Sequence, residues 1–156
     1  MTVVDPRSWL SRVLRPDGPA ALALVRVVVG LVFLSEGIQK FLFTGDLGPG
    51  RFAKIGIPAP EILAPCVGTL EIVGGIALVI GLLSRIVAVP LLFNMLVAIT
   101  STKLVTLGKN GFWKTAHEAR TDLLMIAGLL LILALGPGRR SLDARMRSSG
   151  GSARGH

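Results

Sequence analysis

The apolar residues of this chain are gathered in four blocks of about 20 residues, separated by short polar, Gly-rich or Pro-rich stretches. A helix of that length spans the roughly 30 Å hydrocarbon core of a bilayer. A helix on the surface of a soluble protein would show a polar stripe at helical spacing, and these blocks mostly lack one. The pattern therefore predicts an all-α fold, a four-helix transmembrane bundle. The expected spans are about 20–43, 61–83, 86–107 and 116–135.

The same pattern divides the chain into three regions. Residues 1–19 are expected to form a cytoplasmic, interfacial N-terminal segment, in which one face of a short helix can carry Trp9, Leu10, Val13 and Leu14. Residues 20–136 form the four-span membrane domain. Residues 137–156 form a basic cytoplasmic tail, whose Ser/Gly-rich end is expected to be disordered.

The connections between the spans follow from Gly, Pro and polar residues. A loop is expected at 44–60, a very short turn at Ser84–Arg85 and another loop at Gly108–Lys114. The short turn would make the second and third spans antiparallel neighbours. Pro65 is expected in the first turn of the second span, where its missing N–H costs little.

Charge and cysteine content narrow the class further. The 156 residues carry a net charge of +8, with many Arg residues beside the apolar blocks, where anionic lipid headgroups would attract them. Aromatic residues are few and no nucleic-acid motif is present, which argues against a nucleic-acid partner. Cys66 is the only cysteine, so an intrachain disulfide and a self-contained dithiol mechanism are excluded. It is expected to be a small buried apolar side chain.

Basic residues also predict the orientation. Four spans place both termini on one side, and that side carries the Arg residues of the two tails together with Arg85. The opposite side has fewer firmly exposed bases, namely Arg51, Lys54, Lys109 and Lys114. The positive-inside rule therefore places both termini in the cytoplasm, in a multi-pass protein of the cell (inner) membrane.

Ionisable side chains inside the spans are the candidate chemistry. Such a group costs about 2.5–3.5 kcal/mol on insertion scales, so it persists when it is paired, hydrated or turned into the bundle. Glu71 lies near the midplane, and Glu36 and Lys40 are spaced four apart, which permits an ion pair. The candidate polar or ligand site consists of Glu36, Lys40, Glu71, Lys103 and Asp122. The secondary candidates are Arg26, Glu118 and Arg120.

Two interpretations of this cluster stay open. The acids and bases can pair between helices and fix the packing. Alternatively, they can line a polar pocket that holds a small ligand or relays protons, with Glu71 as the leading residue. His117 beside Glu118 lacks the spacing of a metal site, so no metal is predicted. Small residues are expected to allow close helix contact, namely Gly30, Gly37, Gly74, Gly75 and Gly81.

The chain resembles the DoxX family of bacterial integral membrane proteins over roughly residues 20–136. The resemblance rests on an ordered set of motifs: Arg26-x-x-x-Gly30, Gly37-x-x-Lys40, Phe52, Gly56-Ile57-Pro58, Glu71-x-x-Gly74-Gly75 and Gly81-x-x-x-Arg85. It implies a four-helix inner-membrane protein and a link to respiratory or redox complexes. The related DoxD-type proteins are associated with thiosulfate:quinone oxidoreductase.

The leading functional hypothesis is an accessory subunit of a membrane redox or oxidative-stress system that binds a quinone-like molecule. The sequence has no haem, flavin or iron–sulfur motif, so a quinone or a partner protein would carry the electrons. The expected partners are the lipid bilayer, a protein of a redox complex and further copies of the chain. A small transporter or exporter subunit and a structural scaffold without catalysis remain alternatives, and the residues leave open whether the protein is an enzyme.

Overall fold

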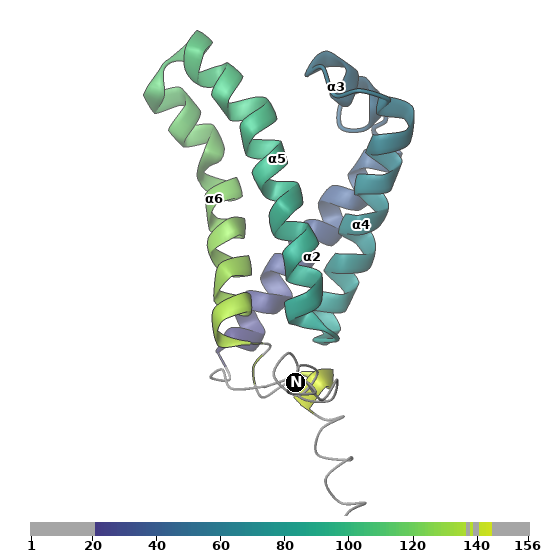
Figure 1. The fold of residues 1–156 in the computed structure, drawn as a ribbon, viewed down its shortest axis with the longest axis vertical. Helices are drawn as coiled ribbons and strands as arrows, with labels where there is room; N and C mark the ends of the chain where they lie inside the picture. Colours follow the sequence, from purple (N-terminus) through teal and green to yellow (C-terminus); the bar gives the residue numbers. More distant parts are fainter. Residues whose placement is uncertain (1–20, 137, 139–140, 145–156) are drawn as a thin grey trace, which may run out of the picture.

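The computed structural model describes residues 21–136, 138 and 141–144. The segment predicted at 1–19, and all of the predicted tail except 138 and 141–144, lie outside the described residues. Within the described part every regular element is an α-helix, which confirms the all-α prediction. The long helices run up and down the molecule, and one short helix lies at its end (Figure 1). They are α2 (Leu22–Leu42), α3 (Pro49–Lys54), α4 (Pro60–Ile80), α5 (Ser84–Asn110) and α6 (Phe112–Leu135).

Three helices are long and apolar enough to cross a membrane: α2, α4 and the stretch Ser84–Lys103 of α5. The 21 residues of α2 or of α4 extend about 31 Å, which matches the hydrocarbon core. Helix α6 is also long, but Glu118, Arg120 and Asp122 interrupt its apolar sequence. Large exposed apolar side chains occur on all four long helices, a surface that lipid solvates better than water.

The turn between α4 and α5 differs from the predicted one. It lies at residues 81–83, because Gly81 adopts a left-handed φ of 75° and ends α4. Ser84 and Arg85, predicted as the turn, are already the first residues of α5. Glycine accepts this backbone conformation because it has no Cβ. The expectation that the two helices are joined by a very short connection is confirmed.

The predicted loop at Gly108–Lys114 is wrong. Helix α5 continues to Asn110 and α6 begins at Phe112, so Gly111 alone joins them, with φ 77°. A single glycine with positive φ can reverse the chain where several residues were expected. The loop predicted at 44–60 in turn contains α3.

Two predictions on α4 are also wrong. Pro65 lies in the helix interior, because α4 already begins at Pro60. Cys66 is exposed, not buried. Helix α4 buries its glycine-rich face against α2, and Cys66 lies on a different, exposed face.

Helices α2 and α4 pack as an antiparallel pair through glycines. A Cβ on Gly30 would lie 2.7 Å from the carbonyl oxygen of Gly75, and a Cβ on Gly37 would lie 2.7 Å from that of Gly68. The spacing is seven residues in each helix, so both contacts fall on one face. This close approach is the packing that small residues allow in membranes. Gly74 serves a second neighbour, since its Cβ would lie 3.0 Å from Leu91 of α5.

The apolar core lies toward one end of the bundle, near the α4–α5 turn. Its buried members include Val29, Phe33, Leu78, Leu91 and Leu129. From this end α5 and α6 lean away from α4 and α3, so the helices diverge toward the other end (Figure 1). We call that other end the outer half. The candidate site lies there.

Candidate functional site

A cavity of about 660 Å³ occupies the outer half between the diverging helices. Residues of all five helices from α2 to α6 line it. Its apolar wall includes Phe33, Met95 and Met125, which also belong to the core, so the packed core forms the floor of the cavity. The volume lies within the range of roughly 300–1,000 Å³ that small-molecule sites occupy.

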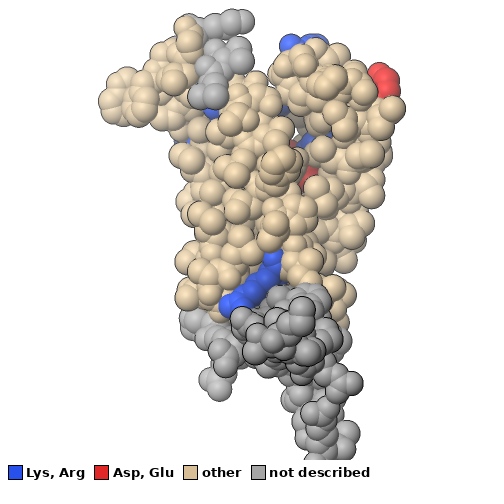
Figure 2. Space-filling view, viewed as in Figure 1, with Lys and Arg blue, Asp and Glu red and all other residues tan. Residues whose placement is uncertain are grey.

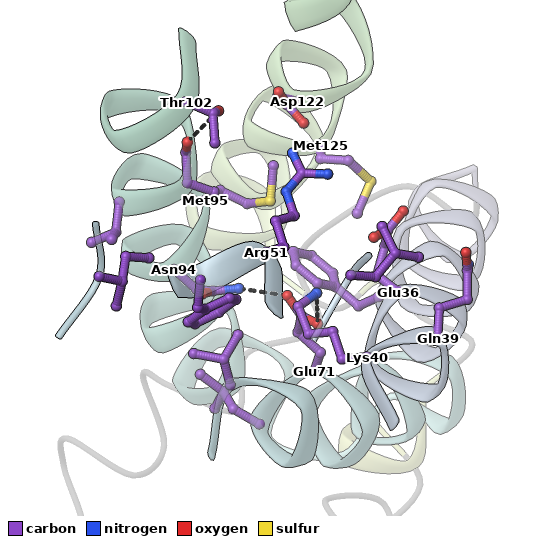
Figure 3. Close-up of a pocket in the computed structure, with 18 of the residues that line it drawn as sticks. Glu36, Gln39, Lys40, Arg51, Glu71, Asn94, Met95, Thr102, Asp122 and Met125 are labelled. Carbon is purple, nitrogen blue, oxygen red and sulfur yellow. Dashed lines mark hydrogen bonds and ion pairs between the residues drawn. The ribbon is translucent and has the colours of Figure 1, made fainter. Parts of the chain in front are cut away.

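Glu71 is the central residue at the polar end of the cavity. Lys40 Nζ of α2 lies 2.5 Å from Glu71 Oε2, and Asn94 Nδ2 of α5 donates a hydrogen bond of 2.8 Å to Glu71 Oε1 (Figure 3). The side chains of Lys40 and Glu71 are 13% and 6% exposed. Each carboxylate oxygen thus has one donor, which is the condition under which a buried charge is tolerated.

The sequence expectation for Lys40 was a pair with Glu36, four residues earlier. The structure pairs Lys40 with Glu71 of α4 instead. Glu36 lines the same cavity but is exposed. The two acids are close enough for the charge of Glu36 to act on Glu71. An ammonium shared with a buried acid is held more firmly than one on the helix surface, because desolvation strengthens the attraction.

Lys103 and Asp122 form a second pair at the outer rim of the cavity. Lys103 Nζ of α5 lies 3.7 Å from Asp122 Oδ2 of α6, and both residues line the cavity. All five primary candidates therefore border one cavity. Glu118 and Arg120, proposed as secondary members, are exposed on α6 and do not line it. Arg120 instead lies 3.4 Å from His117 Nδ1.

Sequence reasoning missed Asn94 and Arg51. A single Asn inside an apolar span is costly unless it is paired, and that signal could have identified Asn94. Arg51 extends from α3 toward the cavity, on the side of Asp122 and Met125 (Figure 3). Among the described residues neither Arg51 nor Glu36 forms a hydrogen bond or ion pair. Nothing in a loop arginine alone would have placed it here.

The three consecutive hydroxyl residues of α5 near Lys103 contribute little to the polarity of the cavity, because they bond to their own helix. Thr100, Ser101 and Thr102 donate hydrogen bonds to carbonyl oxygens one turn back in α5. Of these three only Thr102 lines the cavity, which Thr121 of α6 also borders. The polar character of the cavity therefore comes from its charged and amide side chains.

The remaining secondary candidate, Arg26, belongs to a separate polar cluster at the opposite end of the bundle. Arg26 and Asp143 are 2% and 1% exposed, and the charge of Asp143 acts on the guanidinium. Asp143 also accepts hydrogen bonds from the backbone N–H groups of Leu83 and Ser84, at 2.8 and 3.2 Å. A carboxylate there satisfies donors at the start of α5 and complements its dipole. The contact holds the C-terminal turn at 141–144 against the bundle, and sequence reasoning had not included Asp143 in any site.

Gly81 is necessary for this second cluster. A Cβ at Gly81 would lie 2.5 Å from Arg26 Nη1 and 2.7 Å from Cβ of Ser141. Its role is thus to make room for the guanidinium and to end α4, rather than to bring two helices together.

The arrangement in the cavity can bind a molecule with polar and apolar parts. At one end, Lys40 and Asn94 provide N–H donors and Glu71 provides a carboxylate that can exchange a proton. Methionine and phenylalanine side chains form the adjoining wall, and thioethers adapt to irregular apolar shapes. Arg51 adds a cation with five N–H donors at the rim.

The chain is similar to a known family and to several membrane proteins. A family model described as DoxX matches residues 21–105, which include Lys40, Glu71 and Asn94. The membrane protein Rv3486 of Mycobacterium tuberculosis, whose own function is uncharacterised, is 52% identical over 145 residues, covering 89% of this chain and 88% of Rv3486. The inner membrane protein YphA of Escherichia coli is 30% identical over 81% of this chain and 91% of its own length.

A further relative carries a name that refers to chemistry. CatD of Bacillus subtilis, provisionally named an oxidoreductase, is 34% identical over 82 residues, covering 52% of this chain and 58% of CatD. No solved structure matches the chain significantly.

Proposed function

Since this chain belongs to the DoxX family of membrane proteins, we propose that it is an accessory subunit of a membrane redox system and binds a quinone-like molecule. The observation that carries the proposal is the buried Glu71, held between Lys40 and Asn94 at one end of a largely apolar cavity. A scaffold would need the ion pair but would have no use for the space beside it. The provisional name of CatD as an oxidoreductase supports the redox assignment.

The residues of the cavity fit such a molecule. A quinone carries two electrons and two protons between redox partners when it is bound. Its carbonyl oxygens can accept hydrogen bonds from the ammonium of Lys40 and the amide of Asn94, and its ring can lie against Phe33 and Met95. Glu71 is placed to hold or release a proton at that end of the site. In this proposal a protein partner supplies or takes the electrons.

We also propose that the chain crosses the inner membrane four times and that both of its termini lie in the cytoplasm. Helix α6 is the most highly charged of the four proposed membrane crossings in its first half. Its Asp122 faces Lys103 at the cavity, and Glu118 and Arg120 lie nearer the α5–α6 junction, where a membrane boundary would hydrate them. The name of YphA, an inner membrane protein, supports the location.

The test is to identify quinones that co-purify with the protein in mild detergent, by mass spectrometry. Glu71→Gln is expected to retain about tenfold less quinone than the wild type, because it removes the charge-assisted hydrogen bond that positions Lys40, one of the two quinone donors. Glu61→Gln is the matched control, because Glu61 lies on the same helix but is exposed. It is expected to retain the wild-type amount.

Folding is checked by thermal unfolding of each variant in the same detergent. If the wild type retains no quinone, or if folded Glu71→Gln retains as much as the wild type, the site does not bind quinones. The first result would favour a scaffold in which Glu71 is only a packing ion.

A further inference from the structure

The cavity is open at its side as well as near its outer end. Helices α4 and α5 diverge toward the outer half (Figure 1). In the space-filling view, taken at right angles to the long axis, Lys or Arg and Asp or Glu side chains are visible inside the hollow between α5 and α4 (Figure 2). Charged groups at the bottom of a hollow on the lateral surface mean that the cavity reaches the face that lipid covers.

The edges of this opening are apolar side chains that belong to both surfaces. On α5, Phe93 and Val97 line the cavity and are also 69% and 39% exposed. On α4, Leu63 lines the cavity and is partly exposed too. The wall of the cavity thus continues into the outer face of the protein without a polar boundary. We call the space between these three residues the side opening.

The part of the side opening at Phe93 lies at hydrocarbon depth. Phe93 is the tenth residue of the 20-residue apolar stretch Ser84–Lys103. It precedes Asn94, which donates to the buried Glu71. At Phe93 the side opening is therefore level with the polar end of the cavity, whereas Leu63, the fourth residue of α4, lies nearer the outer end. A molecule that passes Phe93 from the bilayer arrives beside Glu71 without passing through water.

We propose that the ligand enters sideways from the bilayer and is a lipid-soluble amphiphile: its hydrogen-bonding head lies beside Lys40, Glu71 and Asn94, and its long apolar tail extends past Phe93 and Val97 into the lipid. The inference rests on the proposed function and adds the route and the need for a tail. The outer rim is unsuitable for a tail, because Arg51 and the pair Lys103–Asp122 stand there. Passage of an apolar chain between those charges would remove water from them.

The experiment uses the full chain in lipid nanodiscs and two probes. One is a naphthoquinone with a tail of ten or more carbons, and the other is a tail-less naphthoquinone sulfonate that stays in water. Val97→Trp adds bulk in the side opening. It is expected to weaken binding of the tailed probe about tenfold, comparable to losing the burial of about two methylene groups, and to leave the sulfonate within about twofold.

The control variant is Leu124→Trp. Leu124 is 73% exposed on α6 and does not line the cavity, so the same new side chain faces lipid elsewhere. It is expected to leave binding of both probes unchanged. Phe93→Ala, which widens the opening, is expected to speed association of the tailed probe.

The outcomes separate this inference from the function on which it rests. If the wild type binds both probes and Val97→Trp weakens neither, the side opening is not the route, and the ligand site stands. If Val97→Trp weakens binding of both probes equally, its effect is on the cavity and not on the passage of the tail. That result also overturns the route. If the wild type binds neither probe, the proposed function fails and the route fails with it.

Discussion

Glu71 shows how a charge is kept inside a membrane protein. A lone carboxylate in hydrocarbon would be neutralised or expelled, but here each oxygen has its own donor, from a different helix. The three side chains therefore tie α2, α4 and α5 together at one point. They also leave the carboxylate beside a cavity. Structural pairing and ligand binding are thus compatible roles for the same residue.

Asp143 is the other buried acid whose removal has a clear consequence. Asp143→Ala removes the acceptor of two backbone N–H groups at the start of α5 and the charge that acts on Arg26. We expect a loss of about 1–3 kcal/mol in the free energy of unfolding, measured by denaturant titration in mild detergent. Asp46→Ala is the control, since the Asp46 side chain is 88% exposed.

The control is expected to unfold as the wild type does, because a solvated ion pair at 3.9 Å contributes little. Equal stability of Asp143→Ala and the wild type would show that water replaces the carboxylate at this end. In that case the contact with 141–144 is incidental.

At the scale of elements, the pair α2–α4 is defined by backbone approach. Neither helix has a polar stripe that would orient it, and the glycine pairs Gly30–Gly75 and Gly37–Gly68 select the face. In lipid there is no hydrophobic driving force between helices, so close van der Waals contact decides which faces meet. This pairing fixes Lys40 opposite Glu71.

Gly75→Ala tests the close approach. Its Cβ would lie 2.6 Å from the carbonyl oxygen of Gly30, a backbone atom that moves only if a helix moves. We expect a loss of about 1–3 kcal/mol from overpacking, seen as earlier unfolding in detergent. Gly108→Ala lies in α5 with nothing within 4 Å, and should unfold no earlier than the wild type. A stable Gly75→Ala protein would mean that α2 and α4 do not depend on this contact.

At the scale of the whole molecule, the membrane topology determines how the cavity is reached. The packed core occupies the end near the α4–α5 turn, and the cavity occupies the other end, so orientation decides which side of the membrane a ligand site faces. The bases Arg26 and Arg85, together with the Arg-rich tails, favour a cytoplasmic position for the core end. The cavity would then open toward the outside.

Insertion of paired reporters, one active outside and one in the cytoplasm, measures the topology. We expect insertions at 46 and 111 to report the outside, and insertions at 82 and 138 to report the cytoplasm. The reason is the excess of Arg at the core end. The two reporters control each other, because each site should activate only one. An outside signal at 138 would show that α6 does not cross.

Local patterning was enough to predict the helices and the residues that carry charge in them. Apolar runs of bilayer length predicted the four long helices within a few residues at most ends, because hydrocarbon demands satisfied backbone groups over a known thickness. The predicted family membership is confirmed by the match over 21–105. Boundaries failed at two places: the α4–α5 turn lies at 81–83 and not at Ser84–Arg85, and Gly111 alone, with positive φ, replaced an expected loop.

Long-range contacts, in contrast, were decided by the tertiary structure. Spacing along one helix suggested that Lys40 pairs with Glu36, but helix pairing through glycines brought Glu71 within 2.5 Å and Asn94 to its other oxygen. The burial of Asp143 depends likewise on a turn 60 residues earlier in the chain. The sequence shows which ionisable side chains would have a high free-energy cost if they were unpaired in lipid, because that cost depends on the side chain and its depth. Which partner each one finds depends on helix order and rotation, and these arise only when the whole bundle packs.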